Sequence, residues 1–230
     1  MTENKKSMEK FVKTQIEKWD QMHLEESAKD ELRKPVITVS SEPGSGGTGV
    51  AQGIAKRLGF DYFHRYIVEG IAESAEIRRD VIDTIEKERL SGIEDFIASL
   101  IEDQYIYPGI YLEHLLKVIG TIAKHGSAVI VGRGANFIIP PDERISVRVI
   151  APLEVRVQNI ARWHKISVEK ARPRVIGRES KRRAFVRQSF NAKITDPNNY
   201  DLTINTGALK IESAVEAVIG ALTAGLGSNS

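Results

Sequence analysis

Apolar and polar positions along the chain follow periods that predict a succession of helices and strands. The first block, residues 3–30, is polar, but apolar residues recur in it every three or four positions, which is typical of an amphipathic helix. These residues are Met8, Phe11, Val12, Ile16 and Trp19. The stripe must be buried, either on the chain's own domain or against a second copy in a homodimer.

The rest of the chain alternates short β-rich or apolar runs with helical segments. The expected extended segments are residues 36–40, 61–63, 127–131, 145–150 and 201–205. The expected helices are residues 50–58, 65–77, 79–104, 110–124, 153–164, 168–192 and 211–222, with interruptions of the 168–192 helix at Pro173 and Gly177. This alternation predicts an α/β fold, in which a parallel sheet carries helices on both faces.

Composition narrows the class of protein. The 230 residues are 41% hydrophobic and 28% charged, as in soluble globular proteins, and no cysteine is present. A disulfide scaffold, a zinc–thiolate site, an iron–sulfur cluster and a cysteine nucleophile are thereby excluded. No apolar run approaches the roughly 20 residues of a membrane span, and the first residues lack the apolar core of a signal peptide. We therefore expect a cytoplasmic protein.

Charge is concentrated in one quarter of the chain. Residues 142–193 hold 14 Lys or Arg against 5 Asp or Glu, whereas the remaining residues hold 19 against 26. This imbalance favours an anionic partner, such as a phosphate, a nucleotide or a nucleic acid. The alternative is a solvated, arginine-rich helix face. Aromatic residues in the block are few, which makes nucleic acid the less favoured partner.

A glycine-rich turn, residues 40–49 (SSEPGSGGTG), carries the main functional signal. It follows a predicted strand and opens a predicted helix, which is the context that a phosphate-binding loop requires. Glycines let backbone N–H groups surround an anion, and the helix adds its unpaired N–H groups and its dipole. The alternative is a strand–helix turn without a ligand.

This turn departs from the Walker A pattern at two positions. Ser41 replaces its first glycine and Gly47 replaces its lysine, whereas Thr48 keeps the hydroxyl that binds magnesium. Without the lysine, a triphosphate would need a cation from elsewhere. Gly44–Gly49 also match a dinucleotide fingerprint, but no second strand with a ribose-binding acid follows about 20 residues later.

Four segments, in order, resemble the cytidylate kinase-like family, a divergent branch of the P-loop nucleoside monophosphate kinases. They are ITVSSEPGSGGTGVAQGIAKRLGFDYF, VIVGRGANFI, KRRAFVRQSFN and YDLTINTGAL, and the resemblance covers about residues 36–222. It implies a three-layer P-loop kinase fold with a five-stranded parallel sheet. We expect residues 1–34 to be an N-terminal helical extension and residues 35–225 the kinase-like domain. Its acceptor-binding insertion would span about 62–106 and its lid about 166–193.

The resemblance also implies a reaction and the residues that serve it. ATP and magnesium would phosphorylate CMP or dCMP. The donor phosphates would be held by Gly44, Ser45, Gly46, Gly47, Thr48 and Gly49, and Thr48 would coordinate magnesium directly or through water. The acceptor would be bound by Asp61, His64, Arg65, Arg133 and Arg187. The catalytic lid residues would be Arg178, Arg182 and Arg183, which we expect to replace the absent lysine.

Two departures from true cytidylate kinases leave other functions open. Gly134 stands where an aspartate follows the glycine–arginine pair, and the lid segment at residues 178–183 (RESKRR) has an extra base where an acidic residue is expected. The alternatives are a kinase of another small metabolite and a non-catalytic protein on the same fold that senses nucleotides or binds nucleic acid.

Overall fold

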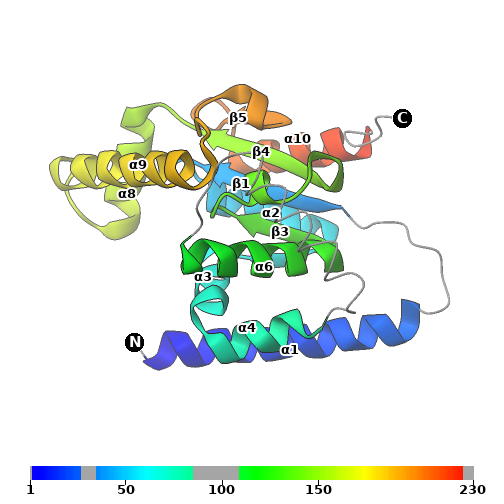
Figure 1. The fold of residues 1–230 in the computed structure, drawn as a ribbon. Helices are drawn as coiled ribbons and strands as arrows, with labels where there is room; N and C mark the ends of the chain where they lie inside the picture. Colours follow the sequence, from blue (N-terminus) through cyan, green and yellow to red (C-terminus); the bar gives the residue numbers. More distant parts are fainter. Residues whose placement is uncertain (1, 27–34, 85–108, 225–230) are drawn as a thin grey trace.

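Five parallel strands form a central sheet in the order β2-β3-β1-β4-β5 (Figure 1). The computed structural model describes residues 2–26, 35–84 and 109–224. The strands are β1 (Val36–Ser41), β2 (Asp61–Phe63), β3 (Ala128–Val131), β4 (Arg144–Ile150) and β5 (Leu202–Asn205). Strands β1, β3 and β4 are buried along nearly their whole length because helices cover both faces of the sheet.

Helices fill the layers on either side of the sheet. They are α1 (Thr2–Glu26), α2 (Gly47–Leu58), α3 (Arg65–Glu73), α4 (Ala75–Ile82), α6 (Ile110–His125), α7 (Ala135–Ile138), α8 (Leu153–His164), α9 (Val168–Phe190) and α10 (Ile211–Thr223). Two short 3₁₀ helices, Pro141–Glu143 and Pro197–Asn199, precede β4 and β5. The predicted α/β architecture is confirmed.

Alternate residues of β1 supply two separate cores. Ile37 and Val39 pack with α2 and α10 on one face, whereas Val36 belongs to the core of α3, α4 and α6 on the other. The hairpin of α8 and α9 extends from one side of the sheet and has a small core of its own, which includes Val157 and Val175 (Figure 1).

The apolar stripe of α1 packs on its own chain. Val12 and Trp19 are buried, and the indole of Trp19 stacks on His125 with ring centroids 3.9 Å apart. Helix α1 lies below α4 at the outer edge of this core (Figure 1). Burial on the chain's own domain therefore accounts for the stripe, and a homodimer through this helix stays a prediction.

Two expectations about helix boundaries are wrong. Helix α9 runs through Pro173 and Gly177 without interruption, because proline removes only one N–H donor and Ala171 and Val175 are buried against α8. The break expected near residue 78 falls at Ser74, whose hydroxyl accepts a hydrogen bond from the N–H of Ile77 and caps α4.

Parts of other expectations lie outside the described residues. These are residues 27–30 of the first predicted helix, residues 85–104 of the 79–104 helix and residues 85–106 of the predicted insertion. Among the residues that are described, no helix is both long and apolar enough to cross a membrane.

Candidate active site

The glycine loop, residues 42–46, joins the carboxyl end of β1 to α2. Gly44 and Gly46 have φ angles of +86° and +80°, in the left-handed region that favours glycine. A Cβ atom at Gly44 would lie 2.4 Å from the carbonyl oxygen of Arg156. Both positions therefore need glycine for the loop to keep this path.

Carbonyl groups of the glycine loop accept hydrogen bonds from side chains of the surrounding protein. Asn159 donates its side-chain amide to the carbonyl of Gly44 at 2.9 Å, and the Thr206 hydroxyl donates to the carbonyl of Ser45 at 2.5 Å. The Ser45 hydroxyl is buried and lies 3.1 Å from the carbonyl of Val149. Among the described residues, the amides of Gly44, Gly46, Gly47, Thr48 and Gly49 donate no hydrogen bond, and the first paired amide of α2 is that of Val50, which donates to the carbonyl of Gly46. Unpaired amides at a helix N-terminus are suited to an anion.

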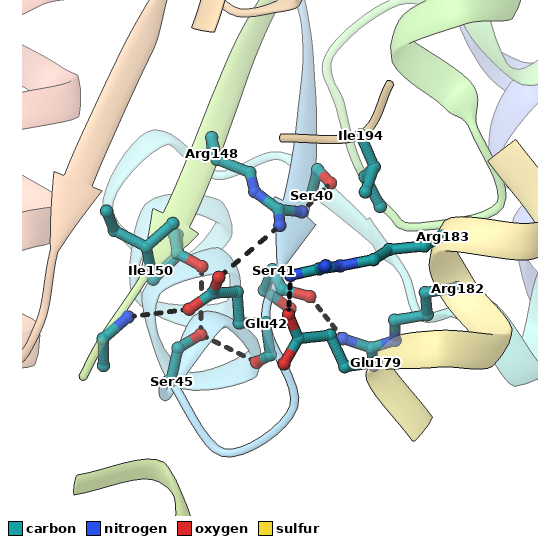
Figure 2. A network of polar contacts seen from close by, with 12 residues as sticks. Ser40, Ser41, Glu42, Ser45, Arg148, Ile150, Glu179, Arg182, Arg183 and Ile194 are labelled. Carbon is teal, nitrogen blue, oxygen red and sulfur yellow. Dashed lines mark hydrogen bonds and ion pairs between the residues drawn. The ribbon is translucent and has the colours of Figure 1, made fainter. Parts of the chain in front are cut away.

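Behind the loop lies a set of matched charges that we call the paired network: Glu42, Arg148, Arg156 and Glu179. The Glu42 carboxylate lies 3.2 Å from Nε of Arg156 and 3.9 Å from a guanidinium nitrogen of Arg148. A second nitrogen of Arg156 donates to Glu179 at 2.9 Å. Figure 2 shows Glu42 between the end of β4, which carries Arg148, and helix α9, which carries Glu179. The network thus joins the loop to β4, α8 and α9.

Both arginines of the paired network are buried, and each carries a carboxylate partner. Arg148 also donates to the Ser40 hydroxyl at 2.8 Å. Burial raises the pKa of Glu179, but the hydrogen bonds and charges of Arg156 and Arg183 together outweigh it and hold that pKa below its ordinary value. Such a network stabilises the shape of the loop, because removing one member leaves another charge buried alone.

In front of the loop, at the carboxyl ends of β1 and β3, lies a cavity of about 320 Å³ that we call the basic pocket. Its described lining contains five cationic side chains and no carboxylate; they are Arg65, Arg133, Arg178, Lys181 and Arg182. Ser40, Ser41 and Asn136 add polar groups, and Phe185 and Ile194 lie on the apolar side. This lining fits an anionic ligand with an apolar portion.

Arg182 lines the pocket beside the start of the glycine loop. From α9 its guanidinium donates a hydrogen bond to the carbonyl oxygen of Ser41 (Figure 2). Burial, together with the charges of Arg65, Arg148, Arg178 and Arg133, lowers the pKa of Arg182 to about 10. The group remains charged at neutral pH, and no carboxylate of the described residues pairs with it. An anion in the pocket would relieve this repulsion.

The second glycine turn, Gly132–Gly134, places Arg133 at the pocket. All three residues have positive φ, and a Cβ at Gly134 would lie 2.2 Å from the ring of Phe190. Arg133 pairs with Glu69 of α3 and lies 5.6 Å from the ring centroid of Phe185. Burial and the charge of Arg65 lower the pKa of Arg133.

Arg65 lines the pocket from the first position of α3, and His64, the residue before it, lies outside the lining. The Nδ1 atom of His64 accepts a hydrogen bond from the N–H of Tyr66 at 3.4 Å and so caps the helix. Burial and the charges of Arg65 and Arg182 lower the pKa of His64. The Arg65 guanidinium lies 4.4 Å from the Tyr66 ring centroid and donates to its hydroxyl at 2.5 Å.

Several predicted site residues lie outside the basic pocket. Arg183 pairs with Glu179 and its side chain is 56% exposed, and Arg187 is exposed farther along α9. Asp61 begins β2, at the opposite end of that strand from the loop edge, and accepts hydrogen bonds from Gln15 and Lys18 of α1 at 2.8 and 2.6 Å. Thr48 is exposed in the first turn of α2.

Sequence reasoning missed the paired network and the buried residues beside it. A lone arginine between Val147 and Val149 in an apolar strand is a detectable signal, because an unpaired charge is costly in a core. That signal marks Arg148. Tyr200 has no comparable signal; its ring lies 5.7 Å from the Arg148 guanidinium, and its hydroxyl donates to the carbonyl of Ile194 at 2.9 Å.

Sequence comparison decides the family. A model of the cytidylate kinase-like family matches residues 36–208, which include the glycine loop and the basic pocket. The chain belongs to the cytidylate kinase-like family. This membership, with the five-stranded parallel sheet, confirms the expected P-loop kinase fold and the expected class, a kinase-like phosphotransferase.

Similar proteins span most of the chain. It is 29% identical over 191 residues to the cytidylate kinase of Pyrococcus horikoshii, covering 82% of this chain and 88% of that protein. The cytidylate kinase of Methanopyrus kandleri is 30% identical, with 74% and 84% covered. An uncharacterised protein from Eubacterium ventriosum has a similar fold, with a TM-score of 0.58 at 16% identity, over 83% of this chain and 99% of that one.

Proposed function

We propose that this protein transfers the terminal phosphoryl group of ATP to a nucleoside monophosphate, with CMP or dCMP as the first candidates. The observation that carries the proposal is the adjacency of two anion sites. Unpaired amides of the glycine loop lie beside a basic pocket without a described carboxylate, and Arg182 lines this pocket and contacts Ser41, the residue that precedes the loop. Two phosphate-bearing substrates need such neighbouring sites. The named archaeal relatives support the choice of acceptor.

The glycine loop would hold the donor. Its amides and the N-terminus of α2 face the phosphates, while the paired network keeps the loop in shape. Thr48 fits a magnesium ligand, because its hydroxyl is exposed in the first turn of α2 and makes no hydrogen bond to the described residues. Magnesium, when bound, would neutralise part of the charge on the donor phosphates.

The basic pocket would hold the acceptor phosphate. Arg65, Arg133 and Arg178 approach it from three elements and present planar guanidinium groups, which bind phosphate oxygens in pairs. Arg182, between pocket and loop, is placed to stabilise charge on the phosphoryl group in transit. This reaction needs positioning and positive charge more than a general base.

A substrate panel tests the proposal. ADP formation is measured with ATP, magnesium and one of CMP, dCMP, UMP, AMP, GMP or a small phosphorylated metabolite. We expect turnover that requires both magnesium and acceptor and that is fastest with CMP or dCMP. Thermal shifts with the same compounds report binding independently of turnover. Absence of turnover with the whole panel would contradict the proposal.

A kinase of another anionic metabolite is the second candidate. It is favoured by Gly134, which stands where an aspartate is expected. It is also favoured by the lining of the basic pocket, because every charged side chain in the described lining is a cation. Turnover confined to a non-nucleotide acceptor would select it. Nucleic-acid binding is disfavoured because the basic stretch does not form one outward face: Arg148 and Arg156 are buried, and Arg178 and Arg182 line the pocket.

A further inference from the structure

Ser41 and Gly47, the two departures from the Walker A pattern, lie in contact. A Cβ atom added to Gly47 would lie 2.2 Å from Cβ of Ser41 and 2.8 Å from its hydroxyl oxygen. The next neighbour is Val149, at an ordinary 3.5 Å. The serine side chain therefore occupies the space that any side chain at position 47 requires, and the two substitutions form one reciprocal exchange.

This exchange excludes lysine from the loop while Ser41 is present. A different cation contacts the backbone of Ser41. Arg182, 141 residues later on α9, donates to the carbonyl of Ser41. Figure 2 shows its side chain reaching the end of β1 from the helix.

Arg182 differs from the other cations near this edge of the loop. Arg148 has Glu42 as its partner, and the neighbouring Arg183 has Glu179. Arg182 has a carbonyl oxygen only, so its charge is not neutralised by a carboxylate of the described residues. Of these three arginines, Arg182 is the one whose environment leaves it available to a phosphate oxygen beside the loop.

We propose that Arg182 takes the place of the missing loop lysine, and that the Ser41–Gly47 exchange reserves this position for it. The inference rests on the proposed function, because it assigns Arg182 to the donor phosphates. A lysine in the loop is always present beside the phosphates, whereas an arginine on α9 is present only while that helix lies against the loop. Donor binding and the docking of α9 are then thermodynamically linked.

The steric half of the proposal is tested by thermal unfolding without ligand. Gly47→Ala should lower Tm by about 5 °C, because it overpacks a closed site. Ser41→Gly combined with Gly47→Ala should recover at least half of that loss. Gly177→Ala, in open space on α9, is the matched control and should not lower Tm. A Gly47→Ala protein as stable as the unmodified chain would overturn the exchange.

The charge half is tested by MgATP affinity, measured calorimetrically, and by turnover. Arg182→Ala should reduce turnover about a thousandfold and reduce affinity less, whereas Arg162→Ala, at an exposed arginine of α8, should change either by less than about threefold. Adding Ser41→Gly and Gly47→Lys to Arg182→Ala should restore turnover at least tenfold; Gly47→Lys without Ser41→Gly should not.

The outcomes separate this inference from the proposed function. If the unmodified protein turns over no acceptor but loses MgATP affinity on Arg182→Ala, the proposed function fails and the role of Arg182 stands. If the protein is an active kinase and Arg182→Ala keeps turnover and affinity within threefold, the role of Arg182 is overturned. Failure of the unmodified protein to bind MgATP would overturn both.

Discussion

Two groups of positive charge flank the glycine loop, and they differ in what neutralises them. Behind the loop, Arg148 and Arg156 belong to the paired network and are buried with carboxylate partners. In front of it, Arg65, Arg178 and Arg182 line the basic pocket, and none of them pairs with a carboxylate of the described residues. The comparison separates cations that hold the fold from cations whose charge is left for a ligand.

This difference has an energetic reason. A buried pair contributes little net free energy, but a buried charge that loses its partner is strongly destabilising. The pocket has the opposite property, because its like charges repel and, together with burial as the larger cause, lower the pKa of Arg182. Stability should therefore respond to mutation behind the loop and to anions in front of it.

The largest effect is expected from Arg156→Met. This change leaves Glu42 and Glu179 without their shared partner and should reduce the free energy of unfolding by about 3–5 kcal/mol. Tm should fall by about 10 °C in a thermal unfolding experiment. Arg162→Met, an exposed arginine on the same helix, is the control and should change stability by less than about 0.5 kcal/mol. Equal stability of the two variants would remove the distinction between the groups.

Anion binding should stabilise the protein by the next largest amount. Pyrophosphate at a concentration one hundred times its Kd should add about 2.7 kcal/mol and raise Tm by about 8 °C. The rise should persist in Arg162→Met and shrink in Arg182→Met, which removes one pocket cation. Sodium chloride at equal ionic strength is the control for screening. If salt alone reproduces the rise, the pocket does not bind the anion.

A smaller effect distinguishes two arginines of α9. Arg178→Ala removes a pocket cation, and we expect acceptor affinity to fall about tenfold, as for loss of one charge-assisted hydrogen bond. Arg183→Ala removes an exposed partner of Glu179 and should change affinity less than about twofold. Isothermal titration with CMP measures both. The opposite order would place the acceptor on the other side of α9.

Local patterns in the sequence were sufficient for most of the fold. Periodicity and turn residues predict the strands and most helices because those signals lie within a few adjacent residues. The error at Pro173 shows the limit: contacts between α8 and α9 override the local propensity for a break. The capping serine at position 74 was a local signal that was present and overlooked.

The site was predictable only where its residues are contiguous. The glycine loop is one segment, so its departures from the Walker A pattern could be read directly. Arg182 and Arg183 are neighbours in a basic run, and their sequence does not separate them. Their contacts differ in the structure. Arg182 contacts Ser41, 141 residues away, whereas Arg183 contacts Glu179 on its own helix. Pairing across such distances depends on the fold.

The smallest expected effect is a pH dependence from His64, which lies beside the pocket cations. Burial and the charges of Arg65 and Arg182 lower its pKa in the folded protein, whereas the unfolded chain keeps a value of about 6.5. As pH falls through 6.5, the unfolded chain takes up more protons at this group, so the folded state loses stability. His64→Asn retains a capping side chain without titrating.

Tm measured from pH 7.5 to 5.5 should therefore fall more steeply in the unmodified protein than in His64→Asn. Pyrophosphate should reduce the difference, because a bound anion offsets the arginine charges that oppose protonation. Parallel pH profiles for the two proteins would contradict a lowered pKa of His64 in the folded protein.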